Sequence, residues 1–412
     1  MINNSGSTST RIDAIDTFRG LTIFLMVFVI QVAGYRNLPQ QMSWFGSLPV
    51  STWHHAEAAW EQIAEGKKAE GLTDEQIASL PEANLKNIGL TVTDLVAPFF
   101  VFIVGLCIPL SRLTRGKEWR RRVFSRTFKL YIAGVLYISL IFGISWWWGI
   151  LQAIALSYLI ASLSMQLSRR GRWIAIFGLL AFHIVMSQFV GWWLHTGETS
   201  QPFFKIGQLD GSLMRPLRIH CLPWVSISYA CITMVGVLLG EAVATKESRK
   251  IVRLGSMLAG IFMAGGYIIH RIGYSTGIWG LCFNKADVSA SYAMFTAGLA
   301  CLVFVGIYYI VDLKGYKKWT TPFCVLGVNA LLAYFMQIVM RLTFRALGLE
   351  AFFSGYPNQT LTQWAGLWQS PVWQHFLLDK TGYNGLLWGL IWTMCLWTII
   401  RFCNKRNIYW KL

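Results

Sequence analysis

Ten long apolar segments restrict what this chain can fold into more than any other feature of its sequence. Most cover about 18 to 22 residues, the length that an α-helix needs to cross a bilayer core of roughly 30 Å. Such unbroken runs do not fit a membrane barrel, whose strands alternate in hydrophobicity over short stretches. The segments lie at about 18–35, 91–111, 126–145, 149–167, 173–194, 223–243, 254–271, 292–312, 323–346 and 384–402.

The composition agrees with this assignment. Hydrophobic residues make up 55% of the 412 residues, charged residues only 13%, and the mean hydropathy is +0.47. A soluble domain of this length carries more charge and less apolar surface. We therefore predict an all-α fold, a polytopic membrane helical bundle of about ten transmembrane helices. It forms a single domain over residues 1–412, with an extracytoplasmic insert at about 57–88.

The basic residues predict the orientation of the bundle. The formal net charge is +17, and two thirds of the 36 Lys and Arg residues fall in alternate connections and at the two ends. Because basic residues gather on the cytoplasmic side, we expect both termini in the cytoplasm, which an even number of helices requires. The positive net charge is then explained without nucleic acid as a partner, because anionic membrane lipids attract basic residues on the cytoplasmic side. Without a cleavable secretory signal or other targeting signal, we expect a retained first helix and a bacterial inner membrane.

Two smaller features concern the outer face. Within the insert, Thr73 and Gln76 have the spacing of a capping box, which predicts one or two short surface helices. Among the eight cysteines, Cys221 and Cys282 both fall near the outer face, where pairing in an oxidising compartment and two free thiols remain alternatives. No cysteine has metal-binding spacing, so no metal site is predicted.

Ionisable groups near the outer face point to chemistry or transport. His54 and His55 follow the first apolar segment, and Asp94 is expected about one turn into the second. A histidine there can act as a general base or carry an acyl group, because its ordinary pKa near 6.5 allows both protonation states. The structural alternative is a loop histidine bonded to backbone. Asp94 is expected to orient the site.

Five motifs in order resemble a known family. Residues 11–22 read RIDAIDTFRGLT, His55-Ala56 is followed by LTVTDLVAPFFVFIVG at 90–105, and GILQAIA occupies 149–155. Asn284-Lys285 precedes a helix, and LGVNA occupies 326–330. This series is similar to the heparan-alpha-glucosaminide N-acetyltransferase family of transmembrane acyltransferases. The chain looks like a bacterial-type member without the lumenal N-terminal domain of the animal enzyme.

The resemblance implies transfer of an acetyl group from cytoplasmic acetyl-CoA to an amino sugar or glycan at the outer face. The family's catalytic histidine corresponds to His55, with His54 as a neighbour able to substitute. Polar side chains within the bundle are candidates for substrate binding, or tie helices together: Gln31, Thr91, Gln152, Asn284 and Asn329. Basic side chains are candidates for binding CoA phosphates, or anchor the inner face: Arg19, Arg112, Arg115 and Arg120. For Arg19, the structural alternative is an ion pair with Asp16.

Two departures from the family pattern keep other functions open. The family commonly has an asparagine in the first helix, and here the nearest amide is Gln31, displaced by one position. A long insert also separates His55 from Gly89. A transporter of a small polar or anionic solute and a degenerate, non-catalytic family member are therefore the alternatives. Beyond lipids and the acceptor, a second copy of the chain, forming a homodimer, is a candidate partner.

Overall fold

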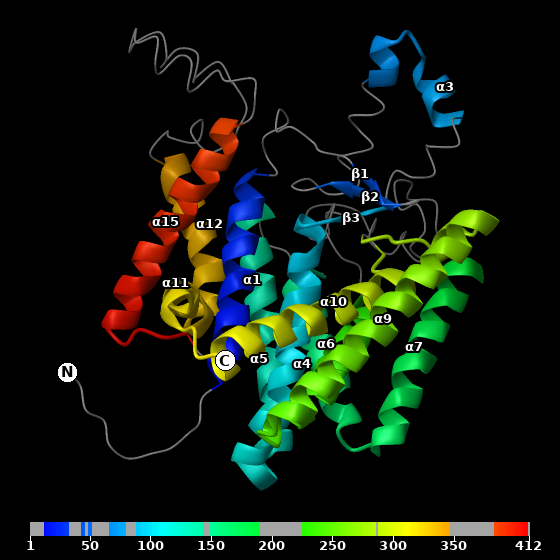
Figure 1. Ribbon diagram of the computed structural model, residues 1–412. Coiled ribbons are helices and arrows are strands. Elements are labelled where there is room, and N and C mark those ends of the chain that lie inside the picture. Colours follow the sequence, from blue (N-terminus) through cyan, green and yellow to red (C-terminus); the bar gives the residue numbers. More distant parts are fainter. Residues whose placement is uncertain are drawn as a thin grey trace, which may run out of the picture.

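The structure is a computed structural model, and it describes residues 12–32, 43–45, 48–51, 66–79, 88–142, 148–189, 225–285, 287–346 and 383–410. This part of the chain is a bundle of long helices with a small sheet at one end (Figure 1). The long helices are α1 (Asp13–Val32), α4 (Val96–Arg115), α5 (Trp119–Phe142), α6 (Ile150–Ser164), α7 (Arg169–Phe189), α8 (Val225–Ala244), α9 (Ser248–Thr276), α10 (Ala290–Tyr308), α12 (Ala330–Ala346) and α15 (Tyr383–Lys405). The shorter helix α11 (Thr321–Val328) precedes α12, and a π-helical turn, Tyr309–Leu313, extends α10.

Each predicted apolar segment overlaps a helix, so the all-α membrane class is confirmed. Within the described residues, five helices are long and apolar enough to cross a membrane, and a sixth span results if α11 and α12 count as one. That pair is bent by 74° at Asn329, a break that the continuous apolar run at 323–346 did not predict. The full number of spans and the side that each terminus faces stay predictions.

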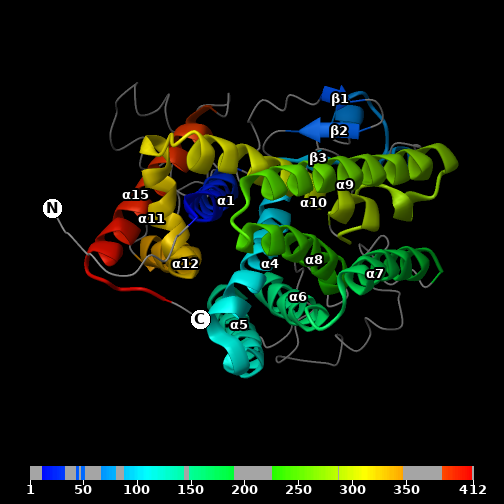
Figure 2. The ribbon, with the colours of Figure 1, turned by 60° about the horizontal axis from the view of Figure 1, so that its bottom comes forward.

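The helices form two groups that share α1 (Figure 2). One apolar core joins α4, α6, α8, α9 and α10, while a second lies among α1, α11, α12 and α15. Helix α4 packs on α8 and α9 on α10 at glycines where no Cβ fits, such as Gly105 against the backbone of Thr233. In a membrane the hydrophobic effect does not drive helices together, because lipid is as apolar as the helix surfaces. Small residues let the two backbones approach closely, and this packing stabilises the contact.

The described ends of the chain lie at one end of the bundle. Near the start of α1, the Asp13 carboxylate pairs with Lys317 at 2.7 Å, and the Ala14 N–H donates to Asp312 beyond α10. At the end of α15, the Asn404 amide donates to the Val325 carbonyl in α11. The basic α4–α5 connection lies at the same end (Figure 1). This arrangement supports the prediction that both ends of the chain face the same side.

The opposite end carries a sheet that the sequence did not predict. Strands β1 (Ser43–Phe45) and β2 (Leu48–Ser51) are antiparallel, and β3 (Leu90–Thr91) joins β2 in parallel. The insert forms the short helix α3 (Asp74–Ser79), and its capping box is confirmed. The Thr73 N–H donates to Gln76 Oε1 at 2.8 Å, and the Gln76 N–H donates to the Thr73 hydroxyl at 3.3 Å.

Candidate functional site

The end of the bundle that carries the sheet joins two motif segments that lie far apart in the sequence. The Gly89 N–H donates to the Phe283 carbonyl at 3.1 Å, and Ile88 forms a β-bridge with Asn284. The segment that leads into α4 is thereby fixed against the connection between α9 and α10. The two resemblance motifs, 90–105 and Asn284-Lys285, therefore belong to one site.

Asp94 lies at the centre of this site. We expected it one turn into the second helix, but α4 begins at Val96 and Asp94 occupies a 3-10 turn, Thr93–Leu95, just before it. Its side chain is fully buried, accepts a hydrogen bond from the Thr91 hydroxyl at 2.7 Å and lies 3.3 Å from the Lys285 ammonium. The Tyr292 hydroxyl donates to its backbone carbonyl. The structure therefore gives this buried carboxylate one hydroxyl donor and one cation as partners.

The α9–α10 connection is itself held by side chains. The Ser289 hydroxyl accepts from the Asn284 N–H at 3.1 Å and donates to the Cys282 carbonyl at 2.7 Å. The Asn284 side-chain oxygen accepts from the Asp287 N–H at 3.2 Å. Asn284, a predicted substrate-binding residue, is buried and its amide oxygen shapes this turn. The Cys282 thiol is buried, which raises its pKa to about 12, and its suggested partner Cys221 lies outside the described residues.

Asp287 is the most unusual acid of this connection. It is buried, and neither carboxylate oxygen has a hydrogen-bond partner among the residues that the structure describes. Burial away from water raises the pKa of this carboxyl well above its ordinary value, so the neutral form is favoured. A ring nitrogen of His183 in α7 lies 3.2 Å from the Asp287 backbone carbonyl. Sequence reasoning missed this acid because its burial depends on packing against α7.

The predicted catalytic histidines, His54 and His55, lie outside the described residues, as do the side chains of Gln31 and Arg115. The strand before the histidines is described. Ser51, the last residue of β2, pairs with Thr91 in β3, and Thr91 donates to Asp94. The segment that leads to the histidines therefore starts at the buried site.

The other predicted substrate-binding residues lie inside the bundle, as their polarity required. Gln152 is fully buried in the first turn of α6, with its side-chain oxygen against Gly134 of α5. Asn329 lies at the break between α11 and α12, where its amide donates to the Ile408 carbonyl at 2.8 Å and its oxygen accepts from the Trp410 N–H at 3.1 Å. Gln152 and Asn329 thus lie on other elements than Thr91 and Asn284, which border Asp94 and the α9–α10 connection.

Two of the predicted CoA-binding arginines have structural partners. Arg19 pairs with Asp16 at 3.3 Å, the structural alternative that its spacing allowed, and donates to the Cys107 sulfur. Arg112 donates to the Met165 carbonyl at 2.8 Å, at the end of α6. Arg120 is exposed on α5. The three do not converge on one site.

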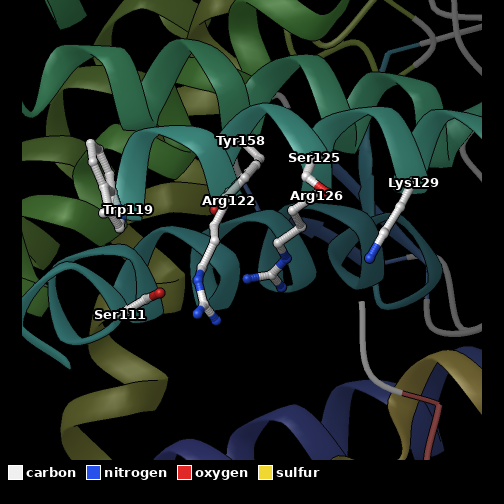
Figure 3. Close-up of a pocket in the computed structure, with 7 residues that line it drawn as sticks. All are labelled: Ser111, Trp119, Arg122, Ser125, Arg126, Lys129 and Tyr158. Atoms are coloured by element: carbon white, nitrogen blue, oxygen red, sulfur yellow. The ribbon is translucent and has the colours of Figure 1, made fainter. Parts of the chain in front are cut away.

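A basic pocket lies nearby instead, between the end of α4, the first three turns of α5 and α6 (Figure 3). Its volume is about 150 Å³, and it is lined by Ser111, Trp119, Arg122, Ser125, Arg126, Lys129 and Tyr158. Arg126 and Lys129 were missed as candidates. The signal was available, because both cations fall inside or at the start of an apolar segment predicted to span the membrane, where charges are rare without a function.

No cluster of three or more His, Cys, Asp or Glu side chains suited to a metal occurs in the described part of the chain. The fold and the two sites thus define an integral helical membrane protein with a buried polar site at one end and a basic pocket toward the other.

No protein-family model matches the chain. Two curated proteins are similar to it over 98% of its length, the heparan-alpha-glucosaminide N-acetyltransferases of Mus musculus and Homo sapiens. The mouse protein is 22% identical over 475 aligned residues and the human protein 23% over 470. The chain is a distant relative of these N-acetyltransferases. It spans 61% and 60% of their lengths, so about two fifths of each relative has no counterpart here.

Proposed function

We propose that this protein is a membrane acyltransferase that moves an acetyl group from cytoplasmic acetyl-CoA to an amino sugar or glycan on the opposite side. One observation carries the proposal: the motif segments around Asp94 and Lys285 form a single buried site, in a chain related along nearly its whole length to N-acetyltransferases. The proposed location is a bacterial inner membrane.

The proposed catalytic base is His55, with His54 beside it. His55 lies four positions after Ser51 in the sequence, and four residues of extended chain span at most about 14 Å. Because Ser51 pairs with Thr91, this limit supports the proposal that His55 acts at the Asp94 site. Asp94 and Thr91 then serve to position the segment and the Lys285 ammonium, without exchanging protons with the substrate.

In the proposed reaction, the neutral imidazole takes a proton from the ammonium of the amino sugar. The free amine attacks the thioester carbonyl, the new C–N bond forms, the C–S bond breaks, and the CoA thiolate takes up a proton. In the alternative order, the imidazole first accepts the acetyl group and the amine then attacks acetyl-imidazole. Accumulation of an acetylated enzyme without acceptor distinguishes the second order from the first.

The deciding experiment is acetyl transfer by the purified protein in proteoliposomes, with labelled acetyl-CoA and glucosamine on opposite sides. We expect transfer by the native chain and by His54→Ala, and loss of at least about a hundredfold in His55→Ala, since a positioned general base contributes about 10²–10⁴ in rate. Equal transfer by native protein and His55→Ala would remove His55 from the mechanism.

A transporter of a small polar solute is the second candidate, and the break at Asn329 favours it. Transporter binding sites commonly use helices broken within the membrane, and α11 and α12 meet at 74° around a buried amide. Absence of both acetyl transfer and CoA binding, together with glucosamine uptake into the vesicles, would support this candidate. CoA binding without transfer would instead identify a degenerate, non-catalytic relative.

A further inference from the structure

The basic pocket on α5 has the composition of an anion-binding site. Trp119, Arg122, Arg126 and Lys129 are spaced three, four and three residues apart, so they share one face of α5 over three turns. Ser111 from α4 and Tyr158 from α6 complete the lining (Figure 3). The seven lining residues include three cations and no acid, and since Arg122 pairs with Glu118 outside the lining, Arg126 and Lys129 give the pocket its net positive charge.

Two buried N–H groups of this lining lack acceptors. Neither Arg126 Nε nor Trp119 Nε1 has a hydrogen-bond partner among the described residues, and both atoms are shielded from solvent. A buried donor without an acceptor costs free energy, and each such group in a native protein calls for an explanation such as a ligand. Bound oxygen atoms would satisfy both.

The cations are held in different ways. The Arg126 guanidinium lies over the Tyr158 ring at 4.9 Å, which fixes its plane. Arg122 donates to Glu118 at 2.7 Å and 3.2 Å, and this contact lowers the pKa of the Glu118 carboxyl. Lys129 is exposed, and none of its contacts involves an acid within the described residues. One oriented guanidinium and one mobile ammonium suit a multiply charged oxyanion better than a single carboxylate.

We propose that this pocket binds a phosphate ester group through Arg126 and Lys129, with Arg122 at its rim. Two classes of ligand carry such a group. One is the nucleotide part of CoA, a source that rests on the proposed function. The other is an anionic phospholipid, whose acyl chain would follow the exposed apolar side chains farther along α5, Leu136 and Leu140.

The test uses the full chain purified in detergent. Binding of adenosine 3′,5′-bisphosphate is measured by calorimetry, and retention of phosphatidylglycerol against phosphatidylcholine by native mass spectrometry. The test variant is Arg126→Gln/Lys129→Gln. The matched control is Arg169→Gln/Arg170→Gln, which removes the same charge from exposed positions at the start of α7, outside the pocket. Lys129→Gln alone keeps the Arg126–Tyr158 contact and guards against misfolding.

We expect the test variant to bind one of the two phosphate probes at least about tenfold more weakly than the native and control proteins, with Lys129→Gln intermediate. Loss of bisphosphate binding alone identifies the nucleotide source, and loss of phosphatidylglycerol alone identifies the lipid. Equal affinities of test and control variants for both probes would overturn the proposal. If the protein transfers no acetyl group, the pocket is still expected to bind anionic lipid. The experiment therefore distinguishes failure of the pocket proposal from failure of the proposed acetyl transfer.

Discussion

Asp94 and Lys285 form an ion pair whose two members differ in burial, and mutation can measure what the pair contributes to folding free energy. Asp94 has no exposed surface, whereas the Lys285 side chain is 22% exposed. Replacing Lys285 by Met leaves a buried carboxylate without its counter-charge, which costs about 3–5 kcal/mol of folding free energy. Neutralising Asp94 as well removes that penalty, so we expect Asp94→Asn/Lys285→Met to be more stable than Lys285→Met.

Unfolding of the purified variants in one detergent measures this order. The matched control is Lys250→Met, which breaks an exposed pair with Glu247 and is expected to cost less than about 1 kcal/mol. A Lys285→Met loss as small as that of Lys250→Met would mean that Asp94 needs no counter-charge.

Asp287 gives the second prediction at this scale, a pH dependence of stability. Its pKa in the folded protein is raised well above 3.8 by burial. Between 3.8 and the folded pKa the unfolded chain has lost this proton and the folded chain retains it. Stability from this group is therefore greatest below about 3.8 and falls as pH rises, by up to ~1.4 kcal/mol per pH unit.

Replacing Asp287 by Asn removes this titration. We expect Asp287→Asn to be more stable than the native chain at pH 7, and the difference between the two to shrink as pH falls toward 4. Melting temperatures at several pH values between 4 and 8 test this. A difference that does not vary with pH would show that Asp287 does not titrate as its burial predicts.

Helix packing carries the prediction at the scale of elements. Gly105 of α4 lies so close to the backbone of Thr233 in α8 that an added methyl group requires the helices to separate. We expect Gly105→Ala to destabilise the protein by about 1–3 kcal/mol. Gly178 of α7 is the control, since no atom lies within 4 Å of an added Cβ. Gly178→Ala should gain up to about 1 kcal/mol from helix propensity. Stabilisation by both substitutions would contradict the observed α4–α8 approach.

The same elements show what the sequence could and could not predict. Apolar length located the helices, and the capping box placed the start of α3, because both signals are local. The strands β1 to β3 were missed, since segments of two to four residues have no periodicity to detect. The sequence placed Asp94 and Asn284 beside predicted helices, but it did not predict the Asp94–Lys285 pair, because that pair depends on how the segment before α4 packs against the α9–α10 connection. Arg126 and Lys129 were missed although the sequence held a signal, since both fall inside or at the start of a predicted membrane span.

At the scale of the whole molecule, the end of the described chain ties the two helix groups together. Asn329 bonds the backbone of Ile408 and Trp410, and the Trp410 ring packs 4.6 Å from that of Phe335 at the main core. The segment from 408 on thus occupies the break between α11 and α12, where freed backbone and amide groups need partners within a membrane. Without the segment from 408 on, the Asn329 side chain keeps only its hydrogen bond to the Asn404 side chain among the partners that the structure describes.

A double-mutant cycle tests this connection. We expect Asn329→Ala to cost about 1–3 kcal/mol in the full chain, and clearly less in a chain that ends at Asn407, because the truncation has already removed the Ile408 and Trp410 partners. Thr343→Ala, an exposed change on the same helix α12, should cost the same in both backgrounds. Unfolding of the four proteins of each cycle gives the coupling. If Asn329→Ala costs the same in both chains, the segment from 408 on does not stabilise the break.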